Sequence, residues 1–158
     1  MARLLTGMNR RRFLLTSSSA VSIGLASSAR GDEAADPWSK TELMEPRELA
    51  ERLNVYKADL HIYCVAFPVL YRGKHIPGAV YAGPGSKDEG VADLRTAARD
   101  LPKDAAIVLY CGCCPIKVCP NIRPAYRALK ALAFSNVRVL NLPTNFHTDW
   151  VLKDYPVA

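Results

Sequence analysis

The sequence contains no uninterrupted apolar run long enough to span a membrane. Residues 13–29 come nearest, but they are too few and carry too many serines for a stable transmembrane helix. There is also no basic patch beyond the first residues, because removing the arginines of residues 1–29 lowers the formal net charge from +6 to +2. No internal repeat is present. We therefore expect neither a stable membrane anchor nor a nucleic-acid partner.

The first 29 residues lack aspartate and glutamate entirely. An arginine pair within residues 9–13 (NRRRF) precedes the apolar, serine-rich run, and residues 27–29 (SSA) offer a cleavage site. This order predicts a twin-arginine signal peptide over 1–29, a linker over 30–45 and one domain over 46–158. We expect a periplasmic or otherwise exported bacterial protein that meets the twin-arginine translocase during export. An ordinary export signal for unfolded chains is the alternative.

Histidine is scarce, and the three histidines lack the spacing of a metal site, whereas five cysteines lie between residues 64 and 119. An exported protein meets an oxidising compartment, in which cysteines commonly pair. An odd count leaves at least one cysteine without a partner in the same chain.

Residues 107–124 (IVLYCGCCPIKVCPNIRP) organise the rest of the chain. Four apolar residues lead directly into Cys111, as in a central parallel strand that is covered on both faces. Gly112 and two prolines then break regular structure, and Pro124 opens a run that favours a helix. Backbone N–H groups of such a loop, together with a helix N-terminus, favour an anion. We therefore predict that Cys111 is a nucleophile whose pKa is lowered in an anion-binding loop.

The remaining segments alternate between strand and helix patterns. Strands are expected over 60–66, near 80–82, over 107–110 and over 137–142, and helices over 46–53, 91–99, 124–134 and 144–153, with loops at 67–74 and 83–90. This alternation predicts an α/β fold with a mainly parallel sheet.

Three stretches, in order, resemble the rhodanese family of sulfurtransferases. Residues 75–80 (HIPGAV) resemble its HIPGA signature, residues 108–111 (VLYC) its strand ending in the catalytic cysteine, and Trp150 with residues 155–157 (YPV) its closing segment. The resemblance spans about residues 38–157. It implies a five-stranded, mainly parallel sheet flanked by helices, and sulfur carried as a persulfide on Cys111.

Two departures from the family affect the expected substrate. The family usually has an aspartate and an arginine before its HIPGA stretch, whereas residues 63–66 (YCVA) have neither. The loop after Cys111 is longer than usual and holds three further cysteines. We expect a small anionic sulfur donor such as thiosulfate, bound by loop N–H groups near Gly112 with Lys117 or Arg123, and a thiol acceptor. Surface charge is the alternative for both cations.

The extra cysteines Cys113, Cys114 and Cys119 leave three alternatives open. They can form a disulfide that joins Cys119 to Cys113 or Cys114, resolve a persulfide on Cys111, or ligate a metal or an iron–sulfur cluster. Their spacing lacks the paired C-x2-C that is usual for zinc, so we expect no metal and no cofactor. Cys64 ends a strand next to the central one and either reaches these cysteines, in disulfides that leave Cys111 free, or fills apolar space.

An exported sulfurtransferase is therefore the predicted function. A thiol–disulfide or persulfide relay, or a cysteine-cluster module that binds metal without transferase activity, is the alternative. A phosphatase-like enzyme is disfavoured, because Lys117 stands six residues after Cys111, where an arginine would be needed to bind two phosphate oxygens at once.

Overall fold

The structure, a computed structural model, describes residues 36–55 and 59–158. Five strands form one sheet in the order β1-β5-β4-β2-β3, and every neighbouring pair is parallel. The strands are β1 (Leu43–Met44), β2 (Leu60–Cys64), β3 (Val80–Tyr81), β4 (Ala106–Tyr110) and β5 (Val137–Leu140). The prediction of an α/β fold with a five-stranded parallel sheet is confirmed.

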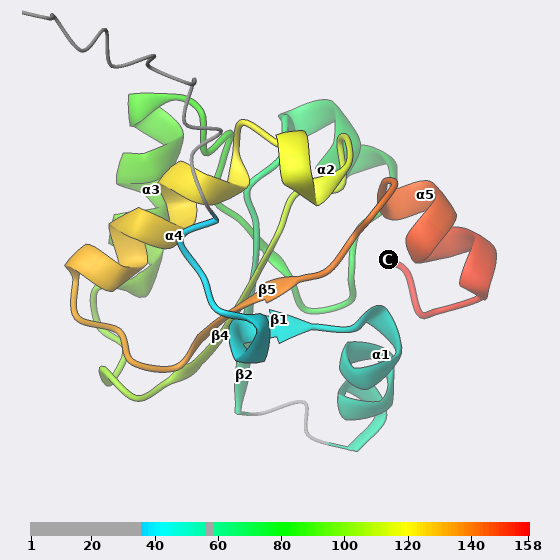
Figure 1. Cartoon of the computed structure of the whole chain (residues 1–158), viewed down its shortest axis with the longest axis horizontal. Helices are drawn as coiled ribbons and strands as arrows, with labels where there is room; N and C mark the ends of the chain where they lie inside the picture. The colour runs from blue at the N-terminus through cyan, green and yellow to red at the C-terminus, as the bar shows by residue number, and fades with distance from the viewer. Residues whose placement is uncertain (1–35, 56–58) are drawn as a thin grey trace, which may run out of the picture. The chain divides into compact units, whose positions relative to one another are not determined.

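Helices cover both faces of this sheet. They are α1 (Pro46–Val55), α2 (Pro68–Gly73), α3 (Asp88–Ala98), α4 (Ile122–Ala131) and α5 (Phe146–Asp149), with the short 3₁₀ turns η1 (Lys40–Glu42), η2 (Ile116–Val118) and η3 (Val151–Lys153). In Figure 1, α3 and α4 lie together on one side of the sheet, and α1 and α5 lie on the other. Among the described residues, no helix has the length and apolar character needed to cross a membrane.

Strand β4 is the centre of the sheet, between β2 and β5. Ile107 to Tyr110 are all buried, which explains why this strand has four consecutive apolar residues without alternation. The parallel register places Cys64, at the end of β2, opposite Tyr110, at the end of β4. The residues that follow these strands therefore meet at one edge of the sheet, where ligands bind in open parallel sheets.

The predicted linker over 30–45 is corrected by an edge strand that the sequence pattern does not reveal. Leu43 and Met44 pair with Val139 and Leu140 of β5, and Trp38 is buried in the core. A two-residue strand is too short to show any periodicity, so its assignment depends on the neighbouring strand. The predicted signal peptide over 1–29 and the start of the linker lie outside the described residues.

One loop prediction and one helix prediction also differ from the structure. Residues 68–73 form α2 instead of a loop, with Pro68 in the first turn, where its missing N–H is not needed. The predicted helix over 144–153 is divided into α5 and η3 by Trp150, whose backbone leaves the helical region at φ −126°. The Asn145 side chain caps α5 by accepting a hydrogen bond from Thr148 N.

Candidate functional site

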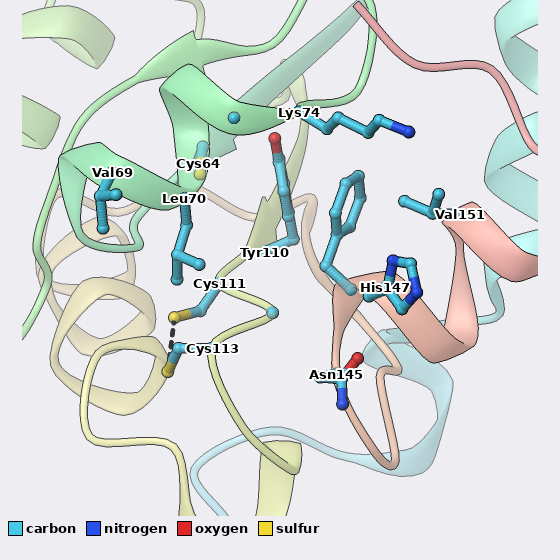
Figure 2. Close-up of a pocket in the computed structure, with 13 residues that line it drawn as sticks. Cys64, Val69, Leu70, Lys74, Tyr110, Cys111, Cys113, Asn145, His147 and Val151 are labelled. Carbon is cyan, nitrogen blue, oxygen red and sulfur yellow. Dashed lines mark hydrogen bonds between the residues drawn. The ribbon is translucent and has the colours of Figure 1, made fainter.

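A pocket of about 470 Å³ opens beside the carboxyl ends of β2 and β4. Cys111 follows β4 directly and lies at this pocket, with only 5% of its surface exposed. Figure 2 shows its sulfur turned toward Cys113. The pocket is lined by Cys64, Val69, Leu70, Gly73, Lys74, Tyr110, Cys111, Gly112, Cys113, Asn145, Phe146, His147 and Val151. The structure therefore places the predicted nucleophile where a small molecule can reach it.

Four cysteines of the loop gather at one point behind the pocket. The Sγ of Cys113 lies 3.3 Å from that of Cys111, 3.0 Å from that of Cys114 and 3.8 Å from that of Cys119. All five cysteines of the chain are free thiols in this structure, so a disulfide stays a prediction. The loop thus brings together the cysteines that the sequence singles out.

Asn121 joins this cluster to the neighbouring loop. Its Nδ2 donates to the Cys111 Sγ at 3.3 Å and lies 3.9 Å from the Cys113 Sγ. Its Oδ1 accepts from Ser86 N at 3.0 Å, which fixes the orientation of the amide. Asn121 is fully buried, and its contact with the sulfurs could not be predicted from the sequence, because an asparagine before a helix is expected to cap the helix. Here the side chain does not cap the helix, and its amide donates a hydrogen bond to the Cys111 sulfur.

The negative charge of the cluster is favoured on Cys119 and not on Cys111, which corrects the expectation that the pKa of Cys111 is lowered. The pKa of Cys119 falls to about 5, because the neighbouring Cys111 thiol favours its charged form and because the backbone N–H groups of Asn121 and Ile122 also point at it. The pKa of Cys111 is raised by its interaction with Cys119 and by burial. The backbone N–H groups at the start of α4 therefore favour a thiolate on Cys119, whereas the sequence pattern predicts it on Cys111.

We expect one thiolate per chain to form near pH 5 in reduced, chelator-treated protein. The ultraviolet absorbance of thiolate, followed from acid to neutral pH, measures it, and Cys119→Ser should remove this step. Since the pKa of Cys119 is about 5 in the folded chain and about 8.5 in the unfolded chain, stability should rise with pH between these values. This contribution is complete above the unfolded pKa and is lost as the pH falls through the folded one. A flat absorbance from pH 4 to 7 would contradict the assignment.

Replacing Asn121 with alanine should lower the free energy of unfolding by about 0.5–1.5 kcal/mol, because the hydrogen bond from the Ser86 N–H to the buried Asn121 side chain is lost. Urea unfolding at neutral pH measures this. Asn121→Asp keeps an acceptor for Ser86 but places a carboxylate beside the sulfurs, so its destabilisation should shrink at acid pH. Asn136→Ala is the control, since Asn136 is exposed and its loss should change stability by less than about 0.5 kcal/mol. An equal loss in both alanine variants would refute the role of Asn121.

The structure does not bring the two predicted anion-binding cations to the pocket. Lys117 lies in η2 and is exposed to solvent. Arg123 donates to the carbonyl oxygens of Ile116, Lys117 and Cys119 and pairs with Asp36. The guanidinium also lies over the Trp38 ring, 5.5 Å from its centre. Arg123 therefore braces the cysteine loop from outside, and the Cys111–Lys117 spacing does not enclose an anion.

Gly112 and Cys64 both line the pocket, as expected for residues at strand ends. Gly112 has φ +76°, and a side chain there would meet Phe146. Cys64 is 1% exposed and interacts with the Tyr110 hydroxyl, and burial raises its pKa. Among the described residues, no sulfur–sulfur hydrogen bond joins Cys64 to the other four cysteines. Cys64 thus packs as a buried thiol apart from the cluster.

Several lining residues come from segments to which the sequence analysis gave no functional role. Phe146 and His147 enter from α5, and Lys74 follows α2. Lys74 is the one lysine, arginine, aspartate or glutamate in the lining, and Figure 2 shows its chain directed away from Cys111. Their positions depend on the packing of α2 and α5 over the sheet edge, which no local pattern encodes.

Comparison with known proteins shows the fold. No family model matches the chain, and no curated protein matches it by sequence. The rhodanese-like domain of the Alr3790 protein from Anabaena is 21% identical, with a TM-score of 0.54, over 74% of this chain and 78% of that one. The BH2092 protein of Bacillus halodurans is 20% identical, with a TM-score of 0.57, over 73% and 74%.

A single-domain sulfurtransferase, RDL2 of Saccharomyces cerevisiae, is 12% identical, with a TM-score of 0.51, over 71% of this chain and 89% of that one. At identities this low, the structural similarity shows the common fold alone, and activity has to be argued from the site. The strand order, the cysteine after β4 and these structural likenesses together show that this chain has the rhodanese-like fold.

Proposed function

We propose that the protein is a sulfurtransferase that carries sulfane sulfur as a persulfide on Cys111 and passes it to a thiol acceptor. The observation that carries this proposal is the position of Cys111, directly after β4 and at the pocket. A sulfur donor that enters the pocket can reach the Cys111 sulfur, and the neighbouring cysteine sulfurs can accept the Cys111 proton. The sulfurtransferase activity of the yeast structural neighbour is consistent with this reading.

The first step follows from the sulfur cluster. The Cys111 sulfur attacks the outer sulfur of thiosulfate and gives its proton to the Cys119 thiolate, and the sulfur–sulfur bond of thiosulfate breaks with release of sulfite. The products are a Cys111 persulfide anion, a neutral Cys119 thiol and sulfite, so charge and atoms balance. A raised pKa makes Cys111 a poor thiolate at rest but a strong nucleophile once its proton has left. Asn121 Nδ2, 3.3 Å from the Cys111 Sγ, stabilises the negative charge that develops there.

The second step transfers the sulfur to an acceptor thiol that enters the same pocket. The acceptor thiolate attacks the outer sulfur of the persulfide, the Cys111 sulfur leaves, and the acceptor becomes the persulfide. Val69, Leu70 and Phe146 give the pocket a largely apolar wall, which favours an acceptor with an apolar portion.

The experiment is a cyanolysis assay on reduced full-length protein. After incubation with thiosulfate and removal of excess donor, cyanide should release about one thiocyanate per chain, and intact mass should show one added sulfur. No thiocyanate and no added sulfur after exposure to thiosulfate, an organic persulfide and polysulfide would rule the function out.

A second candidate function is a persulfide relay, which the 3.3 Å contact between the Cys111 and Cys113 sulfurs favours. In this reaction the Cys113 thiolate attacks the Cys111 sulfur of the persulfide. The Cys111–Cys113 disulfide forms, the two thiols are oxidised, and the outer sulfur leaves as sulfide. An external thiol must then reduce the disulfide to complete the cycle.

Replacing Cys113 with serine separates these two functions. If the relay operates, Cys113→Ser should retain its persulfide roughly 10-fold longer or more and should release little sulfide, because the intramolecular attack is lost. Sulfide release after loading, measured without external thiol, follows this directly. Cys114→Ser is the matched control, since Cys114 contacts Cys113 and not Cys111. Equal persulfide lifetimes in wild type and Cys113→Ser would leave simple transfer as the function.

A further inference from the structure

The sulfurs of Cys111, Cys113 and Cys119 form a compact triangle. Their three Sγ atoms all lie within 4.8 Å of one another, and two of the pairs are 3.3 Å and 3.8 Å apart. A tetrahedral ion with metal–sulfur bonds of about 2.3 Å holds its sulfurs about 3.8 Å apart. The triangle therefore needs only small side-chain shifts to ligate one ion.

The chemistry of this triangle selects a particular kind of ion. All three donors are sulfur, and a small cavity of about 10 Å³ beside Cys111 and Cys119 is otherwise lined by Cys114, Gly112 and apolar residues such as Leu140. Magnesium and calcium need oxygen ligands, whereas thiolates prefer soft ions. We propose that Cys111, Cys113 and Cys119 bind a single thiophilic d¹⁰ ion, Cu⁺ or Zn²⁺, as a site distinct in function from sulfur transfer.

The surroundings supply the outer contacts that a thiolate site requires. Asn121 Nδ2 lies 3.3 Å and 3.9 Å from the sulfurs of Cys111 and Cys113, and backbone N–H groups at the start of α4 point at Cys119. Ser86 holds the amide in this orientation through Oδ1. Hydrogen bonds to ligating sulfurs stabilise their negative charge and orient them.

The site also has a route to solvent and an open position. Cys111 and Cys113 line the 470 Å³ pocket, so an ion reaches the triangle through it. Three thiolates leave a fourth position for a water or thiol from the pocket, as in exchangeable metal sites. Because Cys111 is a ligand, a bound ion blocks the cysteine that is proposed to carry the persulfide. Metal binding and sulfur loading of Cys111 therefore exclude each other.

The test is a metal titration of reduced full-length protein in which all metal has been removed by chelation. Zn²⁺ and, under anaerobic conditions, Cu⁺ are added separately, and bound metal per chain is measured after gel filtration. One equivalent of at least one ion should be retained, with a sulfur-to-metal absorption band. Cys113→Ser and Cys119→Ser should weaken binding at least roughly 100-fold, and Asn121→Ala should weaken it roughly 10–100-fold at the same stoichiometry.

Two cysteines that the proposal leaves out are the matched controls. Cys64→Ser and Cys114→Ser should bind as the wild type does, because neither belongs to the triangle. Retention of neither ion, a loss in Cys64→Ser or Cys114→Ser equal to that in Cys113→Ser, or an iron–sulfur cluster in freshly purified protein would overturn the proposal. Cys113 is only half-buried, so Cys113→Ser remains informative if Cys119→Ser does not fold. Thiosulfate loading of the metal-free samples is scored separately, so either function can fail alone.

Discussion

Cys111→Ser is expected to lower thiosulfate-dependent sulfur loading at least roughly 100-fold, because a serine hydroxyl cannot form the covalent sulfur intermediate. Cyanide-released thiocyanate and intact mass both measure the loss. The substitution is nearly isosteric at a side chain that is 5% exposed, so the fold should persist and its melting temperature should change little. The expected result is a folded chain without the added sulfur.

Two controls make this prediction specific. Lys117→Ala should load sulfur as the wild type does, since Lys117 is exposed and does not line the pocket. Cys64→Ser leaves the same number of cysteines as Cys111→Ser and should still take up sulfur. Normal loading of Cys111→Ser, or equal losses in Cys111→Ser and Cys64→Ser, would refute the assignment of the persulfide to Cys111.

Much of the fold could be predicted because strong local signals lie in its centre. The run of four apolar residues before Cys111 admits few structures other than a buried parallel strand, and the structure confirms it as β4. The edge strand β1 has two residues and no pattern of its own. It exists because β5 offers a free edge, a tertiary cause that propensity does not contain.

The candidate site could be predicted only in part, because the sequence does not show which cysteine lies at the start of α4 or which groups bind Arg123. The spacing of the sequence correctly predicts that the cysteines lie in one loop. The path of this loop, which the spacing does not show, decides which cysteine accepts hydrogen bonds from the N–H groups at the start of α4. Cys119 lies two residues before Asn121 and accepts from these backbone N–H groups, whereas Cys111 accepts a hydrogen bond from the Asn121 side chain. The sequence predicts that Arg123 is available to an anion, but the loop carbonyl oxygens and Asp36 bind its guanidinium.

This division of roles gives the loop its chemistry. A chain in which the helix start faced Cys111 would hold a permanently ionised but weaker nucleophile. With the charge on Cys119, Cys111 keeps its proton until a neighbouring sulfur accepts it. The same grouping of sulfurs that permits this proton transfer also gives the spacing of a metal site, so one cluster supports both proposals.

Gly112→Ala is expected to lower the free energy of unfolding by about 2–5 kcal/mol, the largest stability effect that we predict for this loop. Gly112 has φ +76°, a conformation that costs an L-residue about 1–2 kcal/mol. The new Cβ would also lie 2.4 Å from the Cβ of Phe146, and overpacking of this kind costs about 1–3 kcal/mol. Urea unfolding at neutral pH measures the sum.

The clash at Gly112 cannot be relieved by rotating a side chain. Phe146 N donates to the Gly112 carbonyl oxygen at 3.0 Å, and its ring packs between those of Tyr110 and Trp150. Gly78→Ala is the matched control, since Gly78 has φ +78° but no atom within 4 Å of an added Cβ. It should lose only the backbone part, about 1–2 kcal/mol. Equal losses at Gly112 and Gly78 would mean that α5 moves away freely, and the pocket wall that Phe146 forms would then not be fixed by the cysteine loop.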